Sequence, residues 1–105
     1  KVWFFWRCFK RKPLIMLKIV LSNQFKKDIK LCKSRGLNID DLKVIVDDLA
    51  SGKTLPNKYK DHNLLGEFAG FKECHIHPDW LLIYKIESYN CLFLFRTGTH
   101  SDLFK

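Results

Sequence analysis

The chain has 105 residues, of which 47% are hydrophobic and 29% are charged, and its 19 Lys and Arg against 11 Asp and Glu give a formal net charge of +8. This length is that of a single domain, and the composition excludes a disordered chain. No apolar run approaches the ~20 residues that a bilayer crossing needs, so a soluble domain is expected, and its positive charge favours an anionic partner such as nucleic acid.

The positive charge is concentrated at the start of the chain. Residues 1 to 15 contain five Lys or Arg and no acid, whereas residues 16 to 105 contain 14 Lys or Arg and 11 acids, or +3. The apolar stretch at residues 2 to 6 is too short for a signal-peptide core. Because patterned sequence begins at Met16, we interpret residues 1 to 15 as an appendage and residues 16 to 105 as the domain. Contact with a membrane surface or an RNA strand is the alternative role for the appendage.

Four cysteines, Cys8, Cys32, Cys74 and Cys91, are scattered without a CxxC pair, which argues against a zinc knuckle or a thioredoxin-like site. The last three lie among apolar neighbours, as buried free thiols do. Two disulfides are the alternative. Free thiols indicate a reducing, cytoplasmic setting.

The domain begins with a predicted strand and an amphipathic helix. Residues 17 to 21 are typical of a short strand, and either Ser22 or Asn23 can cap the helix that follows. We expect this helix over residues 23 to 35, with Gly36 ending it. Its basic face is either a solvated surface or an electrostatic contact surface. The apolar stripe is Phe25, Ile29 and Cys32, and the basic face carries Lys26, Lys27, Lys30 and Lys33.

A second helix has a clear start and end. Asn38 is the expected cap, Asp40 and Asp41 complement the positive first turn, and Gly52 ends the helix. Residues 53 to 70 then have the Pro, Asn and Gly content of a long loop, and a loop of this length in a small domain is usually functional. The apolar stripe of the second helix is Leu42, Ile45, Val46 and Leu49.

The rest of the chain has the periodicity of strands. We expect strands over residues 71 to 77, 80 to 86 and 91 to 97, joined by tight turns, and a short tail from residue 100. The predicted fold class is therefore α+β, in the order β-α-α-β-β-β. An antiparallel meander takes the first strand at its edge, and both helices pack on one face. The opposite face is left as a concave surface.

Histidines in the second half of the domain are candidates for catalysis. His62 lies in the predicted loop. Strand alternation puts Glu73, His75 and His77 on one face, so the side chains of His75 and His77 should point together. A histidine on a strand is alternatively a structural residue. His75 and His77 together can ligate a metal, but no third ligand stands at a familiar spacing, and no metal site is predicted.

A second group should gather at one end of the sheet. Asp79 lies at a turn, and Arg96 and His100 lie at the end of the neighbouring antiparallel strand, so the three can converge. A histidine, a carboxylate and an arginine suit cleavage of a phosphodiester, in which a ribose 2′-hydroxyl attacks phosphorus. Alternatively, Arg96 pairs with an acid. Trp80 and Phe104 are core or tail aromatics, with base stacking as the alternative.

Four motifs carry a family resemblance. They are YKDHNLLG, HIHPDW, LLIYK and the terminal RTGTHSDLF. Together they resemble the YafQ-type branch of the RelE/ParE toxin superfamily, over residues 16 to 105. The resemblance implies a RelE-like fold, with a helical hairpin on one face of a small twisted, mainly antiparallel sheet.

The resemblance also implies an activity and partners. Members are bacterial type II toxins, metal-independent endoribonucleases that need no cofactor and cut mRNA in the ribosomal A site of the 30S subunit. A cognate antitoxin holds them inactive, and operator DNA is bound only through that antitoxin. No membrane partner is implied.

The resemblance also implies roles for the residues of this sequence that match the family's functional positions. His100 corresponds to the general acid, Asp79 to the base or to a group supporting it, and Arg96 to the phosphate stabiliser. His62 and His75 position or assist. The substrate-binding positions implied are Lys60, Trp80 and Phe104.

Two other functions stay open at this point. A ParE-like relative would poison DNA gyrase without nuclease chemistry, and a non-catalytic module would only bind RNA or the antitoxin. The alignment of Lys26, Lys30 and Lys33 on one helix face motivates the hypothesis that the antitoxin wraps this face. Coverage of the catalytic groove is the alternative.

Overall fold

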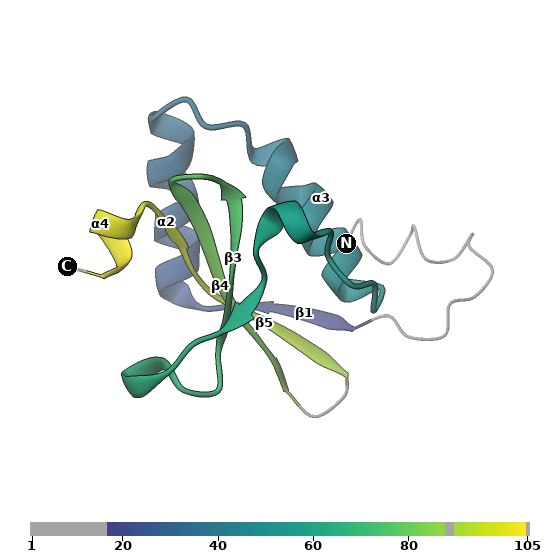
Figure 1. The fold of residues 1–105 in the computed structure, drawn as a ribbon. Coiled ribbons are helices and arrows are strands. Elements are labelled where there is room, and N and C mark those ends of the chain that lie inside the picture. The colour runs from purple at the N-terminus through teal and green to yellow at the C-terminus, as the bar shows by residue number, and fades with distance from the viewer. Residues whose placement is uncertain (1–16, 88–89, 105) are drawn as a thin grey trace.

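The computed structural model describes residues 17–87 and 90–104 (Figure 1). The interpretation of residues 1 to 15 as an appendage, and the prediction for Cys8, lie outside these residues. Within the described ranges, no helix is long and apolar enough to cross a bilayer.

A five-stranded sheet in the order β1-β5-β4-β3-β2 organises the domain. Strand β1 (Lys18–Leu21) runs parallel to β5 (Cys91–Gly98), and all the other pairs are antiparallel. The predicted α+β class, with the first strand at the edge of a meander, is therefore confirmed. The remaining strands are β2 (His62–Asn63), β3 (Lys72–His77) and β4 (Trp80–Glu87).

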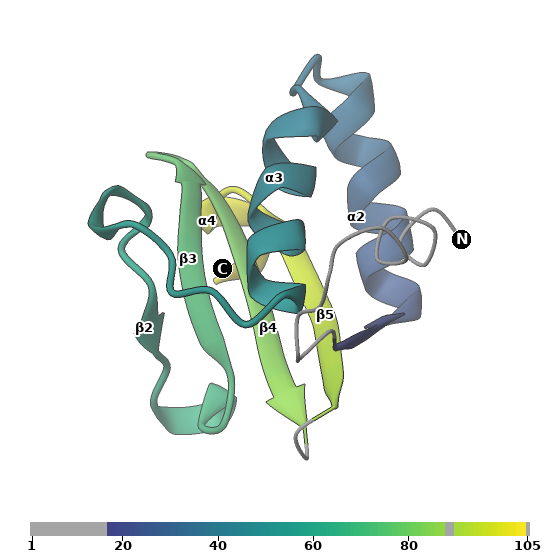
Figure 2. The ribbon, with the colours of Figure 1, turned by 90° about the vertical axis from the view of Figure 1, so that its right-hand side faces the viewer.

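Two helices cover one face of the sheet (Figure 2). In α2 (Asn23–Ser34), the Ser22 hydroxyl accepts a hydrogen bond from the backbone N–H of Phe25 at 2.9 Å, so Ser22 is the cap. Asn38 caps α3 (Ile39–Ala50) through the N–H of Asp40, as predicted. The apolar stripes of both helices pack against the same side of the three central strands, and this packing forms the main core.

The opposite face of the sheet carries a smaller apolar cluster. Leu81 and Ile83 of β4 contact Leu103 of the short helix α4 (His100–Leu103), with Phe71 and Phe95 packed alongside. Figure 2 shows α4 behind the sheet, on the side away from α3. The predicted C-terminal tail is thus partly helical, and this short helix sets the position of His100.

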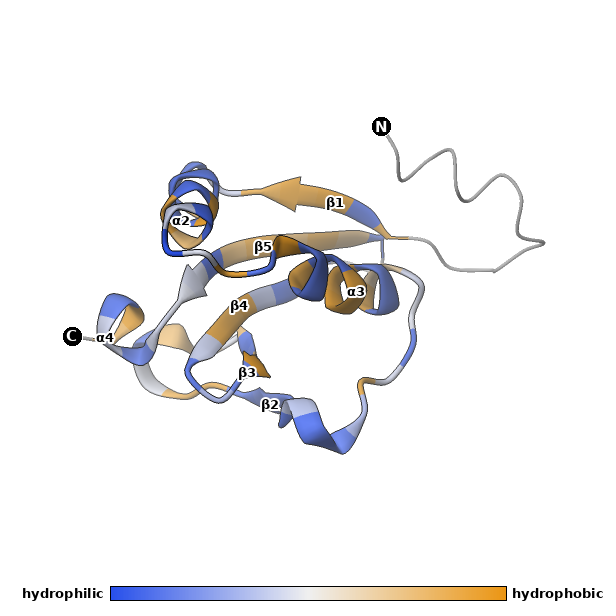
Figure 3. Cartoon of the chain, turned by 90° about the horizontal axis from the view of Figure 1, so that it is seen from above, coloured by the Kyte–Doolittle hydropathy of each residue, from blue (hydrophilic) through white to orange (hydrophobic). Residues whose placement is uncertain are grey.

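The predicted loop over residues 53 to 70 contains structure. Two single turns of 3-10 helix, η1 (Asn57–Tyr59) and η2 (Gly66–Phe68), flank β2, which pairs with the outer edge of β3. In Figure 3 the β2 edge is hydrophilic, whereas β1 and β5 are largely hydrophobic. Strand β2 is an addition to the predicted order β-α-α-β-β-β, because its two residues are too few to show a periodic pattern.

A bulge in β3 separates two histidines that alternation alone would place together. His75 pairs with Leu81 and His77 pairs with Trp80, so the register shifts between the two histidines. His77 turns to the helical side, where its Nε2 lies 2.7 Å from Oδ2 of Asp41 in α3. The prediction that His75 and His77 point together is wrong, and so is any metal site built on the two.

The described cysteines are free thiols, as predicted. Cys32 and Cys74 are buried, and Cys91 is partly buried. Burial, the largest cause, raises the pKa of Cys74 to about 12 and also raises the pKa of Cys32. These two thiols stay protonated at neutral pH, which makes them poor nucleophiles.

Candidate active site

A carboxylate and an imidazole meet at one end of the sheet. Asp79 lies in the turn between β3 and β4, and His100 is the first residue of α4. Oδ1 of Asp79 lies 3.2 Å from Nδ1 of His100 and accepts the backbone N–H of His100 at 3.4 Å. Because a carboxylate oxygen only accepts, Nδ1 carries the proton and Nε2 of His100 is left for another partner. Both side chains are more than half exposed, so a solute can reach the pair.

Local sequence fixes the position of His100. Strand β5 ends at Gly98, and Thr99 caps α4 in a capping box with Asp102. A side chain at Gly98 would clash, because an added Cβ would stand 2.9 Å from Oδ2 of Asp102. That oxygen also accepts a hydrogen bond from Nη1 of Arg35 at 2.7 Å, and this contact connects α4 to the end of α2. The end of the sheet therefore presents His100 in one orientation.

A buried carboxylate joins two further histidines on the same face. The side chain of Glu73 on β3 is only 7% exposed, and its Oε1 lies 3.2 Å from Nε2 of His62 and 3.7 Å from Nε2 of His75. A buried carboxylate is costly unless positive or hydrogen-bonding groups compensate it. His62 lies within hydrogen-bonding distance of Glu73 and His75 lies just beyond it, so the two rings gather around this carboxylate.

His62 has an acceptor on each ring nitrogen. Its Nδ1 lies 2.8 Å from the carbonyl oxygen of Lys60, and its Nε2 faces Glu73. These two acceptors hold the ring of His62 in one orientation. Lys60 has a left-handed backbone conformation, with φ of +49°, which is uncommon for a residue other than glycine. This turn directs the Lys60 carbonyl at His62.

The two groups lie side by side. The ring centroids of His75 and His100 are 6.0 Å apart, and those of His62 and His75 are 6.3 Å apart. His75, with 18% of its side chain exposed, is the link between the Glu73 cluster and the Asp79–His100 pair. The face opposite the helices thus gathers four of the predicted site residues, His62, His75, Asp79 and His100.

An aromatic group borders these histidines. Phe104, just after α4, lies with its ring centroid 6.4 Å from that of His100 and packs edge-on against Phe68 at 5.6 Å. Phe104 is 39% exposed although it is a large apolar side chain. It is therefore placed to contact a ligand at His100, as the base-stacking alternative requires.

Arg96 has a different partner from the one expected. Its Nε and Nη2 donate to the two carboxylate oxygens of Asp28 in α2, at 2.8 and 3.3 Å. None of its recorded polar contacts reaches Asp79 or His100. The pair uses two of the five guanidinium donors, and the side chain is 25% exposed. The structure therefore brings Asp79 and His100 together and holds Arg96 through α2.

Trp80 lies in the core. Its ring is 2% exposed, and its Nε1 donates to the hydroxyl of Thr97 at 2.9 Å. This burial favours the core alternative over a direct contact with substrate, and Trp80 is not included in the site proposed below. Its outer contact is with His77, whose ring stacks on it with centroids 6.0 Å apart.

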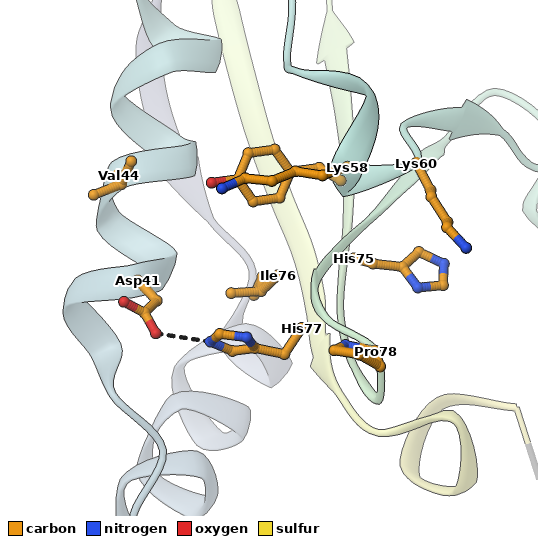
Figure 4. A pocket seen from close by; sticks show the side chains of 9 residues that line it. Asp41, Val44, Lys58, Lys60, His75, Ile76, His77 and Pro78 are labelled. Carbon is orange, nitrogen blue, oxygen red and sulfur yellow. Dashed lines mark hydrogen bonds and ion pairs between the residues drawn. The ribbon is translucent and has the colours of Figure 1, made fainter.

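Beside this site lies a pocket of about 510 Å³, between α3, η1 and the end of β3 (Figure 4). Lys60 and His75 stand at one side of it, and the Asp41–His77 pair stands at the other. The described residues hold no cluster of three or more His, Cys, Asp or Glu side chains suited to a metal ion.

Comparison with known proteins identifies the family. The family model described as "Bacterial toxin of type II toxin-antitoxin system, YafQ" matches residues 17–105. The chain belongs to the YafQ toxin family. The mRNA interferase toxin YafQ of Escherichia coli K12 is 40% identical over 92 residues, which cover 87% of this chain and 99% of that protein.

Solved structures of similar proteins have the same fold. YafQ in the E. coli DinJ-YafQ toxin-antitoxin complex matches with a TM-score of 0.79 and 40% identity, over 87% of this chain and all of that one. A metal-bound toxin from Helicobacter pylori matches with a TM-score of 0.80 and 46% identity, over 85% of this chain and all of that one. The RelE-like fold expected from the motifs is therefore confirmed.

Two residues of this YafQ-family site were missed by sequence reasoning. Glu73 shares a face with His75, but one glutamate on a strand has no distinctive pattern. Asp28 did have a signal, since it stands three residues after Phe25 and four before Cys32, on the apolar stripe of α2. An acid at a buried helix position needs a cation, and Arg96 is that cation.

Proposed function

We propose that this YafQ-family chain is an endoribonuclease that cleaves mRNA bound in the ribosomal A site. The observation that carries the proposal is the Asp79–His100 pair, exposed beside a second imidazole on the helix-free face. The 40% identity to an mRNA interferase toxin supports it. In the reaction, the ribose 2′-oxygen bonds to phosphorus, the bond from phosphorus to the 5′-oxygen breaks, and a 2′,3′-cyclic phosphate and a 5′-hydroxyl result.

His100 is the general acid. Asp79 accepts a hydrogen bond from Nδ1–H and keeps the ring in one orientation, so that Nε2–H of the imidazolium can donate a proton to the departing 5′-oxygen. Asp79 thus supports the acid, which is one of the two roles that the resemblance allowed. The second oxygen of Asp79 stays available to solvent and substrate.

His75 is the general base in this proposal. A base must take the 2′-hydroxyl proton on the side of the phosphate opposite the acid, and the His75 ring lies 6.0 Å from that of His100. Two imidazoles at this separation can approach one phosphate from two sides. Glu73 positions His75, and His62 helps to hold Glu73 in place.

Arg96 stabilises the phosphate with the three guanidinium donors that Asp28 leaves free. Phe104 stacks on a base next to His100, and Lys60 binds the RNA backbone beside His75. These are binding roles, so substitution of Lys60 or Phe104 should affect substrate affinity more than the chemical step.

Primer extension on a message translated by purified ribosomes tests the proposal. Wild-type protein should cut within the A-site codon, and His100→Gln should reduce the cleavage rate by ~100-fold or more. Ser101→Ala is the matched control, because this exposed neighbour lies on the same turn of α4. Equal cutting by wild type and His100→Gln would contradict the assignment of the acid. No cutting by wild type, with trapped DNA gyrase instead, would favour a ParE-like activity.

We also propose that a cognate antitoxin neutralises this chain by wrapping α2. The proposal is supported by membership of a type II toxin family and by the E. coli relative solved with DinJ. Lys26, Lys30 and Lys33 are all exposed at helical spacing, and they form a basic stripe for an acidic segment that folds on binding.

Charge reversal tests the docking surface. Replacing Lys26, Lys30 and Lys33 by Glu should weaken antitoxin binding and reduce its salt dependence. The matched control reverses three exposed lysines elsewhere, Lys18, Lys43 and Lys53. Equal affinity of the two triple variants would contradict docking on α2 and direct attention to the catalytic groove.

A further inference from the structure

The pocket of about 510 Å³ between α3, η1 and the end of β3 shares His75 and Lys60 with the site described above, but its other lining residues have no role in the chemistry proposed there. Its volume lies in the ~300–1,000 Å³ range of small-molecule sites. Four of these lining residues carry polar groups: Asp41, Lys58, Tyr59 and His77. We propose that this pocket binds the mRNA nucleotide next to the cleaved linkage and discriminates between bases. This inference rests on the proposed function and deepens it.

The pocket lies next to the position proposed for the reacting phosphate. His75 lines the pocket and also lies 6.0 Å, centroid to centroid, from His100. In Figure 4, Lys60 extends alongside the His75 ring, on the opposite side of the pocket from Asp41. An RNA strand with one phosphate between His75 and His100 can therefore place a neighbouring nucleotide in the pocket.

The pocket is lined by two cations and one carboxylate. Lys58 and Lys60 come from η1 and the residue after it, and both are exposed cations suited to a phosphate; in Figure 4, Lys60 stands beside His75 while Lys58 extends toward α3. Asp41, in the first turn of α3, stands on the α3 side. A nucleotide has the matching polarity, because its phosphate is anionic and the amino groups of adenine, cytosine and guanine are donors.

The Asp41–His77 pair forms the end that reads the base. Nε2 of His77 lies 2.7 Å from Oδ2 of Asp41, which leaves Oδ1 of a 42% exposed carboxylate to accept from a base amino group. The His77 ring is held on one side by buried Trp80, in a stacked arrangement at 6.0 Å, and is itself 55% exposed. Its free side is a platform for stacking a base. The bulge in β3 turns His77 toward the pocket.

The test is a titration of the full-length wild-type protein with the four nucleoside 5′-monophosphates, followed by NMR. Saturable shifts should be confined to pocket residues, and AMP, CMP and GMP should bind more tightly than UMP, which lacks an amino group. Lys58→Gln should weaken all four by a similar factor of ~3–10, because it removes a phosphate contact. Asp41→Asn should remove the preference over UMP. Lys43→Gln, an exposed lysine on the outer side of α3, is the control.

Absence of saturable shifts at the pocket would overturn the inference, and so would an unchanged nucleotide ranking in Asp41→Asn together with unchanged affinities in Lys58→Gln. Mononucleotides contain no internucleotide linkage, so this binding does not depend on cleavage. A wild-type protein that binds them but never cuts mRNA would contradict the proposed function and leave the pocket standing. A wild-type protein that cuts mRNA but binds no mononucleotide would contradict the role proposed for the pocket and leave the proposed function standing.

Discussion

Asp28 and Arg96, 68 positions apart in the sequence, form a two-pronged ion pair between α2 and β5. Strand β1 ends at Leu21, opposite Leu94, so the rest of β5 has no neighbouring strand on that side. Asp28 fills this gap, and its Oδ2 also accepts the backbone N–H of Thr97 at 3.1 Å. One buried carboxylate therefore closes the sheet edge and orients the arginine assigned to the phosphate.

The first prediction concerns this pair. Asp28→Asn should lower the free energy of unfolding by about 3 kcal/mol, because it leaves Arg96 partly buried without its counter-charge. It should also reduce mRNA cleavage, since Arg96 is no longer held. Urea unfolding and primer extension measure the two effects. Glu67→Gln, at an exposed acid in η2, is the control. Unchanged stability in Asp28→Asn would contradict the role given to this contact.

The second prediction concerns the close approach at Gly98. Gly98→Ala should displace the Asp102 carboxylate, with α4 and His100, because the new Cβ would stand 2.9 Å from Oδ2. Cleavage should fall by ~10-fold or more, since misplacing a catalytic group is costly. Gly36→Ala is the comparison, because that residue has φ of +82° but nothing within 4 Å of an added Cβ. It should cost about 1 kcal/mol of stability and leave cleavage intact. Full activity in Gly98→Ala would show that α4 tolerates the shift.

The third prediction is a pH dependence at Arg35 and Asp102. The Arg35 guanidinium, the largest cause, and the backbone N–H of Thr99 lower the pKa of Asp102 to about 2. Because this pKa lies below the ordinary value of 3.8, the carboxylate stabilises the fold above that pH. This contribution is lost as the pH falls through about 2.

Arg35→Gln should therefore lower the free energy of unfolding only slightly near pH 5, since solvent screens a surface pair. The difference from wild type should shrink as the pH approaches about 2. Urea unfolding at several pH values gives the two curves. Parallel curves across the whole range would mean that Asp102 does not titrate through its contact with Arg35.

Sequence periodicity was sufficient for the framework of the fold. The stripe of α3 and its Asn38 cap, the three strands of the meander and the first strand all follow from local pattern, and the structure agrees within a residue or two at each end. The convergence of Asp79 and His100 also followed, because a turn and a strand end meet at the same edge of an antiparallel sheet.

The missed features depend on contacts between distant residues. Strand β2 is two residues long and exists because it pairs with β3, and the bulge that turns His77 away from His75 has no local signal. Arg96 was expected beside Asp79. Instead it forms an ion pair with Asp28, because α2 packs against the unpaired edge of β5. Local pattern predicts elements, whereas the side-chain partners at a sheet edge depend on what packs there.

The central claim is that Asp79 acts through His100, and a double-mutant cycle on the rate of mRNA cleavage tests it most directly. Asp79→Asn should slow cleavage by ~10-fold or more and His100→Gln by ~100-fold or more. Because the two residues work as one unit, the double variant should be no slower than His100→Gln alone. If the two effects instead multiply in the double variant, Asp79 has a role independent of His100, and the acid catalysis proposed from the 3.2 Å contact is contradicted.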